Sequence, residues 1–404
     1  MTKASTCCVV GGGPAGMMLG YLLARARVNV VVLEKHRDFL RDFRGDTIHP
    51  STLRVMDELG LLGDFLALPH QRAEYLSASV GRQALQLADF TRLPGPCRFI
   101  AFMPQWDFLD FLAQRAKALP GFQLRMNTAG EQPIAENGRV VGVRGHGPEG
   151  PVEIRADLVV AADGRHSPLR DAAGMAVTEI GAPMDVLWFR LPREAHDKAE
   201  TFGRFDRGRF LVLINRGAHW QCGFVIPKGS FDHQRARGID AFRAEIAGLE
   251  PPLADRVDTI GSWDDVKLLT VAVNRLATWW RPGLLCIGDA AHAMSPIGGV
   301  GINLAIQDAV ATANILAGPL RNGRVKDSHL AAVQRRREWP TRMTQRLQVF
   351  IQDRVIRRAL GNTGPAAPPL LMRGFAAIPL LRRVAARIIG LGFRSEHVAD
   401  AIRW

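Results

Sequence analysis

The stretch that decides the fold is Thr6-Cys7-Cys8-Val9-Val10-Gly11-Gly12-Gly13-Pro14-Ala15-Gly16, in a chain of 404 residues. An apolar run leads into the glycines, and a helix-compatible stretch follows to Arg27. A second apolar run, from Val28 to Leu33, ends at Glu34. Strand, glycine-rich turn, helix, strand and acid in this order make a complete dinucleotide-binding βαβ unit. We therefore expect an α/β fold with a Rossmann-like unit.

Each residue type in this glycine-rich turn (residues 11–16) has a physical role. Gly11 permits the tight turn, Gly13 lets the backbone approach a pyrophosphate, and Gly16 lets the helix pack closely on the sheet. Backbone N–H groups at the helix N-terminus face the phosphates, and the Glu34 carboxylate can accept hydrogen bonds from ribose hydroxyls. A glycine-rich turn without a ligand is the alternative, but the flanking strands and the acid argue against it. The expected contact residues are Gly11, Gly13, Pro14, Ala15, Gly16, Glu34 and Lys35.

Two further motifs each consist of an apolar strand that ends in a turn with a carboxylate. The first runs from Asp157 to Arg170 and contains Asp163-Gly164. The second runs from Gly283 to His292, contains Gly288-Asp289, and continues through Pro296 to Asn303 and then Gln307-Asp308-Ala309. Either motif alone could be an ordinary strand–helix turn with an Asp N-cap.

Together, in this order and at these separations, the three motifs resemble the class A FAD-dependent monooxygenases, the p-hydroxybenzoate hydroxylase-like family. The resemblance covers roughly residues 5–62, 100–175 and 276–312. It implies a Rossmann-like FAD-binding domain, an interleaved antiparallel β-sheet substrate domain and C-terminal helices. It also implies bound FAD, with NADH or NADPH as co-substrate.

The resemblance assigns further cofactor contacts. Asp163 and Gly164 are expected near the pyrophosphate, Gly288 and Asp289 near the ribityl hydroxyls, and Gln105 near the phosphoribityl chain. A glycine turn that opens a helix is expected at the flavin ring, with residues Pro296, Gly298, Gly299, Val300, Gly301, Ile302 and Asn303. Arg44 matches an FAD-contacting arginine, although an ion pair with Asp42 or Asp46 is the alternative, and Gln105 could instead be solvated.

The expected domain limits alternate along the chain. The FAD-binding unit takes residues 1–74, 100–175 and 276–320, the substrate sheet 75–99 and 176–275, and a C-terminal helical segment 321–404. Four apolar runs predict strands of the substrate sheet, at 186–191, 210–214, 220–226 and 266–271, whereas 198–209 includes polar and helical stretches. From Gly301 the chain is expected to be helical, with Pro340 and the prolines of 365–369 as breaks.

Composition excludes several classes of protein. The excess of 52 Lys and Arg over 39 Asp and Glu is dispersed, which argues against nucleic-acid binding, and Arg335-Arg336-Arg337 is expected on a solvated helix face. The five cysteines lack metal-ligand spacing, so no metal site is expected. No apolar run is long enough for a transmembrane helix, and no signal peptide is expected before the first strand. A cytoplasmic location follows as an expectation.

The function implied by the resemblance is hydroxylation of an aromatic, polyketide-like or quinone-like small molecule through a flavin C4a-hydroperoxide, with O2 as the oxygen source. Alternatives are a halogenase or a geranylgeranyl reductase of the same fold, and a flavin-storage protein. Trp188-Phe-Arg-Leu-Pro does not match the Trp-x-Trp-x-Ile-Pro segment typical of halogenases. His49 is the weak candidate for an acid or base, and His292 is expected to pack beneath FAD.

The oligomeric state stays open between monomer and homodimer. Near the end of the chain, Leu380, Leu381, Val384, Ile388 and Ile389 can share one helical face. We expect this face to pack on the FAD-binding domain. Peripheral contact with an anionic membrane is the less favoured alternative.

The purified protein is predicted to be yellow and to release FAD, not FMN, on denaturation. The reason is that Glu34 and the glycine-rich turn suit the adenosine and pyrophosphate, which FMN lacks. Chromatography of the released flavin measures this, and release of FMN would contradict the interpretation of the first motif.

Overall fold

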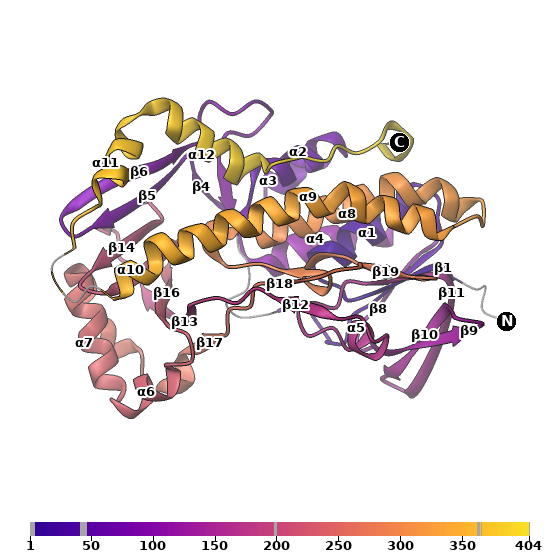
Figure 1. The fold of residues 1–404 in the computed structure, drawn as a ribbon, viewed down its shortest axis with the longest axis horizontal. Helices are drawn as coiled ribbons and strands as arrows, with labels where there is room; N and C mark the ends of the chain where they lie inside the picture. Colours follow the sequence, from indigo (N-terminus) through magenta and orange to yellow (C-terminus); the bar gives the residue numbers. More distant parts are fainter. Residues whose placement is uncertain (1–4, 41–46, 198–199, 362–363, 365, 404) are drawn as a thin grey trace.

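The computed structural model describes residues 5–40, 47–197, 200–361, 364 and 366–403. Two sheets organise the fold, and a long helical layer runs beside them (Figure 1). The first sheet has eight strands, with β9 and β10 continuing from β11. Its path is β19 (Trp280–Arg281), β20 (Leu284–Cys286), β11 (Gly150–Ala161), β1 (Ser5–Val10), β2 (Val30–Leu33) and β8 (Phe122–Arg125).

The centre of this sheet is parallel, because β1 pairs in parallel with β11 and β2, and β11 with β20. Strand β2 is buried along its whole length, as expected for a parallel strand covered on both faces. Strands β9 (Ala129–Glu136) and β10 (Arg139–Gly147) form an antiparallel extension with the first part of β11. Helices α1 (Pro14–Arg25), α4 (Gln105–Lys117), α8 (Gly301–Arg321) and α9 (Asp327–Ile351) make the helical layer (Figure 1).

The second sheet joins distant segments of the chain. Its seven strands run β17 (Lys267–Leu269), β13 (Met184–Pro192), β16 (His219–Pro227), β15 (Arg209–Asn215), β14 (Phe202–Asp206), β5 (Tyr75–Val80) and β6 (Gln83–Asp89). All pairs are antiparallel except β14 with β5. Helix α7 (Ile239–Leu249) covers one face through Phe242 and Ile246, which pack with Phe189 and Phe224. This interleaved α/β architecture confirms the expected fold class, while the exact domain limits stay a prediction.

Shorter elements complete the described chain. Two three-stranded sheets contain β3 (Thr47–Ile48), β7 (Ile100–Phe102) and β4 (Gln71–Ala73), and β12 (Val177–Glu179), β18 (Asn274–Leu276) and β21 (His292–Ala293). The remaining α-helices are α2 (Pro50–Glu58), α3 (Leu62–Leu66), α5 (Pro168–Ala172), α6 (Phe231–Ala236), α10 (Arg357–Leu360), α11 (Leu370–Ala377), α12 (Pro379–Leu391) and α13 (Asp400–Arg403). Single turns of 3₁₀ helix cover Pro251–Leu253, Val257–Thr259, Trp263–Asp265, Gly288–Ala290 and Ile297–Gly299, and a π-helical turn covers Gln352–Ile356.

Two local expectations were wrong. Pro340 does not break the helical region but lies inside α9. A proline there removes one backbone hydrogen bond, and burial of Val333, Thr341 and Thr344 along the same helix offsets that loss. Residues 202–206, expected within a polar and helical stretch, form strand β14, because pairing with β5 and β15 satisfies their backbone groups.

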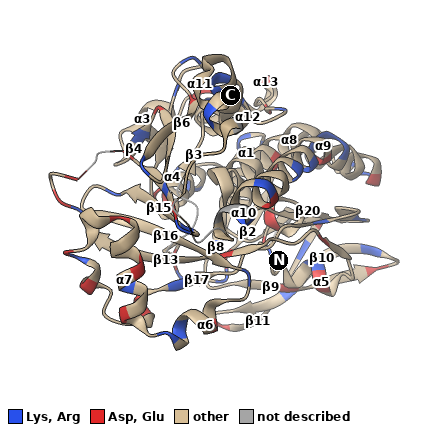
Figure 2. Cartoon of the chain, turned by 60° about the vertical axis from the view of Figure 1, so that its left-hand side comes forward, with Lys and Arg blue, Asp and Glu red and all other residues tan. Residues whose placement is uncertain are grey.

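The C-terminal helix α12 also differs from expectation. Leu380 and Val384 are 66% and 45% exposed, whereas Leu381 and Ile389 are partly buried, so these residues do not form one buried face. The buried Ala386 packs with Phe90 and Leu93, which follow β6 in the chain, so α12 lies mainly on the second sheet and also contacts α2. Arginines and lysines are spread over many elements rather than gathered in one place (Figure 2).

One described helical stretch, Ile297–Arg321, is long and apolar enough to cross a membrane, but 72% of its apolar window is buried inside the protein. Burial of this kind is typical of a core helix.

Two glycines with almost the same backbone angle provide a matched test of packing. Gly283 has φ of +77° and Gly138 has φ of +76°. A Cβ on Gly283 would lie 1.9 Å from the Val140 carbonyl oxygen, whereas nothing lies within 4 Å of one on Gly138. Gly138→Ala should therefore cost only the left-handed penalty of about 1–2 kcal/mol.

Gly283→Ala should cost clearly more, because the backbone of β10 must also move. Urea unfolding of both variants measures the difference. Equal losses would show that the close contact at Gly283 does not hold β10 against the β19–β20 hairpin.

Candidate cofactor site at the carboxyl ends of the parallel strands

The three sequence motifs meet at one edge of the first sheet. The glycine-rich turn follows β1, Glu34 follows β2, Asp163 follows β11, and Gly288 follows β20. These four strands are neighbours and parallel, so their carboxyl ends lie side by side. In open α/β sheets this edge is where ligands bind.

Steric contacts explain two of the three motif glycines in the first turn. A Cβ on Gly11 would lie 2.3 Å from the Ala162 carbonyl oxygen, and Gly11 has φ of +106°. A Cβ on Gly16 would lie 1.9 Å from the Gly11 carbonyl oxygen. Gly13 differs, because nothing lies within 4 Å of its Cβ position, which leaves the backbone open on that side. Pro14 and Ala15 begin α1 directly after it.

Glu34 is anchored to this turn. Its carboxylate accepts hydrogen bonds from the backbone N–H of Gly12 at 2.9 Å and of His36 at 3.1 Å. The residue is 8% exposed, whereas the following Lys35 is exposed. Glu34 is therefore held in one place relative to the start of α1, as ribose recognition would require.

The Asp163-Gly164 turn carries a buried carboxylate. One oxygen of Asp163 accepts a 3.5 Å bond from Leu169 N–H, and the other is buried without a hydrogen-bond partner. Burial raises the pKa of Asp163 to about 6, although a hydrogen bond from Ser167 lowers it in part. Gly164 has φ of +91° and open space at its Cβ position.

The Gly288-Asp289 turn is linked to the Asp157–Arg170 motif by a contact that the sequence analysis did not predict. Arg165 Nη2 lies 3.5 Å from Asp289 Oδ2, and both side chains are about one-third exposed. The neighbouring Gly288 has φ of +58° and donates its N–H to Asp308 Oδ2 at 3.1 Å. No spacing pattern identifies Arg165 or Asp308 as partners of this turn, because both contacts arise from the tertiary fold.

The segment 296–303 leads into α8. Gly298 and Gly299 have φ of +75° and +62°, and Gly301 begins the helix, which has no side-chain cap. Thr47 Oγ1 donates to the Gly299 carbonyl at 2.7 Å. A Cβ on Gly299 would lie 2.3 Å from that hydroxyl oxygen, so Thr47 is what requires glycine there.

Asn303 ties this segment to α2. Its amide nitrogen donates to the Thr47 carbonyl at 2.9 Å, and its oxygen accepts from His49 N–H and Thr52 Oγ1, both at 2.8 Å. These contacts hold Asn303 against Thr47 and α2, and its contact with the cofactor stays a prediction. Pro296, Val300 and Ile302 are partly buried at the same end of α8.

His49 has an environment unsuited to proton transfer near neutral pH. It is fully buried, and its Nδ1 donates to the Ile389 carbonyl of α12 at 2.7 Å. Burial lowers the pKa of His49 to about 4, so the ring is neutral at pH 7. These contacts favour a structural role over the catalytic role expected of it.

Gln105 is the first residue of α4 and partly buried. Its contact with the cofactor stays a prediction. Arg44 lies outside the described residues.

The arginine cluster 335–337 was expected on a solvated helix face, and this holds for the exposed Arg335 but is wrong for Arg337. Arg337 is fully buried, with its Nε 2.9 Å from Asp308 Oδ1 and its Nη1 3.2 Å from Glu396 Oε1. Its burial depends on these two carboxylates.

His292 is buried, as expected, and donates its Nε2 proton to Asp308 at 2.6 Å. Among the described residues, no group of three or more His, Cys, Asp or Glu could hold a metal ion.

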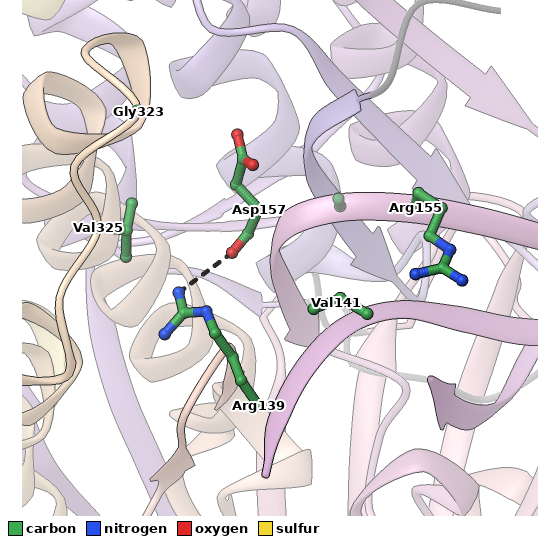
Figure 3. A pocket seen from close by; sticks show the side chains of 7 residues that line it. Arg139, Val141, Arg155, Asp157, Gly323 and Val325 are labelled. Atoms are coloured by element: carbon green, nitrogen blue, oxygen red, sulfur yellow. Dashed lines mark hydrogen bonds between the residues drawn. The ribbon is translucent and has the colours of Figure 1, made fainter. Parts of the chain in front are cut away.

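A hollow of about 420 Å³ lies at the other end of the same sheet, beside Arg139, Arg155 and Asp157 (Figure 3). Arg139 lies 3.4 Å from Asp327, and Arg155 pairs with Glu136. Since both arginines already pair with carboxylates, the hollow offers no cationic site that competes with the motif edge.

The residues at the motif edge fit FAD. Gly13 leaves its backbone open, Asp163 has an unpartnered buried oxygen, and Glu34 is fixed beside the first turn. These features define a dinucleotide-binding flavoprotein of the α/β class. The family model described as FAD binding domain matches residues 4–347, and the chain belongs to this family.

Known proteins agree with this assignment. The chain is 36% identical to 6-methylpretetramide 4-monooxygenase of Streptomyces rimosus, over 96% of this chain and 94% of that protein. The solved p-nitrophenol 4-monooxygenase of Pseudomonas putida DLL-E4 has a TM-score of 0.80 at 20% identity, covering 98% and 100% of the two chains. A myxobacterial FAD-dependent halogenase, the chondrochloren halogenase, has a TM-score of 0.73 at 20% identity, covering 85% and 82%. The expected resemblance to FAD-dependent monooxygenases is confirmed.

Asp163 makes FAD binding testable by pH. If this carboxylate lies near the pyrophosphate, its ionisation above pH 6 repels the phosphates, and the bound phosphates raise its pKa further. FAD should bind roughly fivefold more tightly at pH 5.5 than at pH 7.5, for a rise of about one pKa unit on binding.

Titration of apoprotein with FAD at both pH values measures the difference in affinity. Asp163→Asn should abolish the pH dependence, and Asp171→Asn, which changes an exposed carboxylate of the following helix α5, should keep it. If FAD affinity depends on pH equally in Asp163→Asn and in the unchanged protein, Asp163 is not near the phosphates.

Proposed function

We propose that this protein is an FAD-dependent monooxygenase that hydroxylates an aromatic or polyketide-like small molecule, with NADH or NADPH as reductant and O2 as oxygen source. The observation that carries the proposal is the convergence of Gly11, Glu34, Asp163 and Gly288 at one sheet edge, beside the glycine turn that opens α8. The long match to 6-methylpretetramide 4-monooxygenase supports the polyketide-like substrate class.

In this proposal each part of FAD has its own residues. Glu34, with Lys35 beside it, binds the adenosine ribose, and the N–H groups at the start of α1 bind the pyrophosphate together with Gly164. Asp289 and Gln105 bind the ribityl chain, and Pro296 to Ile302 lie against the ring. When bound, FAD supplies the redox chemistry, accepting a hydride from the nicotinamide and activating O2 for transfer of one oxygen atom.

The N-terminus of α8 contributes electrostatically. Val300, Gly301 and Ile302 form the start of a 21-residue helix without a side-chain cap. The partial positive charge there favours an electron-rich ring placed over it. Thr47 Oγ1 donates to the Gly299 carbonyl, and the Asn303 amide nitrogen donates to the carbonyls of Thr47 and Gly299. These hydrogen bonds hold the helix end in place when charge develops.

The second sheet supplies an apolar cover. Ile297, next to Pro296, packs in one apolar cluster with Trp188 and Phe210 of strands β13 and β15, together with Val186 and Val225. An apolar layer of this kind excludes water from the ring and suits a large aromatic substrate. The substrate itself stays unassigned beyond this class.

The proposal predicts that purified, FAD-loaded protein oxidises NADH or NADPH faster when a true substrate is present. A panel of 6-methylpretetramide, simpler phenols and indoles tests the class. With ¹⁸O2, one labelled oxygen atom should appear in the product, as measured by mass spectrometry.

Two outcomes would contradict the proposal. A product whose mass depends on added halide would assign halogenase chemistry. A protein that consumes no nicotinamide with any member of the panel, although it holds FAD, would favour flavin storage or a reaction of another type.

A further inference from the structure

We propose that buried Asp308 and Arg337 position the Gly288-Asp289 turn for FAD and couple it to the C-terminal tail (residues 394–403). This inference rests on the proposed contact between that turn and FAD. Asp308 lies at the end of the motif that begins at Gly283, but neither Asp308 nor Arg337 was predicted to contact the cofactor.

Asp308 lies on α8 and contacts both ends of the segment 288–292, which contains the turn. Its Oδ2 accepts hydrogen bonds from the Gly288 N–H at 3.1 Å and from His292 Nε2 at 2.6 Å, while Oδ1 accepts from Arg337 Nε at 2.9 Å. Burial alone would raise the pKa of Asp308, but His292 and Arg337 outweigh burial and lower it. The carboxylate is therefore ionised, and its charge strengthens all three hydrogen bonds.

The turn has little freedom to move elsewhere. Gly288 has φ of +58°, and a Cβ there would lie 3.2 Å from Ala15 Cβ and 3.3 Å from Ala305 Cβ. Ala15 belongs to the first turn of α1, which the proposal places at the pyrophosphate. Asp308 thus sets the position of Asp289 and its distance from the phosphate-binding helix.

A stability role alone does not explain this cluster. Burying a carboxylate and a guanidinium costs free energy, and well-packed apolar residues of similar size are often equally stable or better. Apolar residues could not accept a hydrogen bond from the Gly288 N–H. The charged pair is therefore the feature that fixes the turn.

Arg337 extends the contact to the tail. Its Nη1 donates to Glu396 Oε1 and to the Arg394 carbonyl, both at 3.2 Å. Arg336 Nε also donates to Glu396, at 2.8 Å. The Glu396 N–H donates to the side chain of Gln307, the residue before Asp308. One residue of α8, Gln307, and two adjacent residues of α9 thus hold this part of the tail, and Asp308 reaches it through Arg337.

Other helices anchor the rest of the tail. The Val398 N–H donates to Glu58 of α2 at 2.8 Å, and the Ala399 N–H donates to Asn314 of α8 at 2.9 Å. Figure 1 shows the tail running from α12 toward α13 along the helical layer. Docking of the tail and binding of FAD should therefore favour each other, since coupling between two sites is reciprocal.

The first experiment measures the FAD Kd by titrating apoprotein. Asp308→Asn keeps the side-chain shape but loses the charge, and should raise the Kd about tenfold, the weakening expected for a charge-assisted hydrogen bond. Glu396→Gln, on the tail side, should raise it about threefold. Glu338→Gln is the matched control, because it changes an ion-paired carboxylate of α9 outside the network, and its Kd should stay within about twofold.

The second experiment follows amide hydrogen exchange of residues 394–403 with and without FAD. In the unchanged protein and in Glu338→Gln, FAD should slow this exchange about fivefold or more, by the same reciprocity. In Asp308→Asn, the slowing by FAD should disappear. A purely structural role would not produce this loss, because it would change exchange equally with and without FAD.

The outcomes separate the two proposals. If Asp289→Ala weakens FAD binding but Asp308→Asn and Glu396→Gln do not, the network is structural only and this inference is wrong. If Asp289→Ala also has no effect, the proposed cofactor contact is wrong. If Asp308→Asn fails to fold, Glu396→Gln decides between the outcomes. If this variant binds FAD with an unchanged Kd, and FAD slows its tail exchange as in the unchanged protein, the proposed coupling is wrong.

Discussion

The rest of the structure depends on the approach of two backbone segments at the carboxyl edge of the first sheet. The Gly11 Cα faces the Ala162 carbonyl so closely that an added Cβ would lie 2.3 Å from its oxygen. Ala162 N–H donates to the Val10 carbonyl at 2.7 Å, and Gly11 N–H to the Leu33 carbonyl at 2.8 Å. Because no side chain separates these strands at their ends, the glycine-rich turn and Asp163 come together.

Buried carboxylates at the same edge differ in whether their oxygens are hydrogen-bonded. Glu34 and Asp308 are buried carboxylates whose oxygens accept backbone N–H groups of Gly12 and Gly288. Asp163 instead keeps one buried oxygen without a partner. Buried polar atoms are nearly always paired in native proteins, so the unpaired oxygen of Asp163, at the edge where the three motifs meet, fits a place that a ligand or water completes.

The second sheet is assembled from strands that lie far apart in the sequence. Strand β5 pairs in parallel with β14, and β6 supports α12. This arrangement places the apolar face that carries Trp188 in one cluster with Ile297, at the glycine turn before α8. The apolar cover of the proposed ring site therefore comes from β13, β15 and β16, whose pairing joins segments distant in the sequence.

The sequence by itself determined the elements whose conformation is set locally. Apolar runs, glycines at fixed offsets and a terminal acid specify strand, turn and helix through short-range sterics, so residues 6–34 and the motifs at Asp163 and Gly288 were predicted correctly as structure. Tertiary structure alone decided which polar groups are buried. Arg337 was expected in solvent because a run of arginines usually lies there, but its partners Asp308 and Glu396 are 29 and 59 residues away. His49 was the weak candidate for an acid or base, and its contact with α12 in the fold favours a structural role. Periodicity reports local geometry and hydrophobicity, whereas the pairing of a buried charge depends on which distant segments the completed fold brings against it.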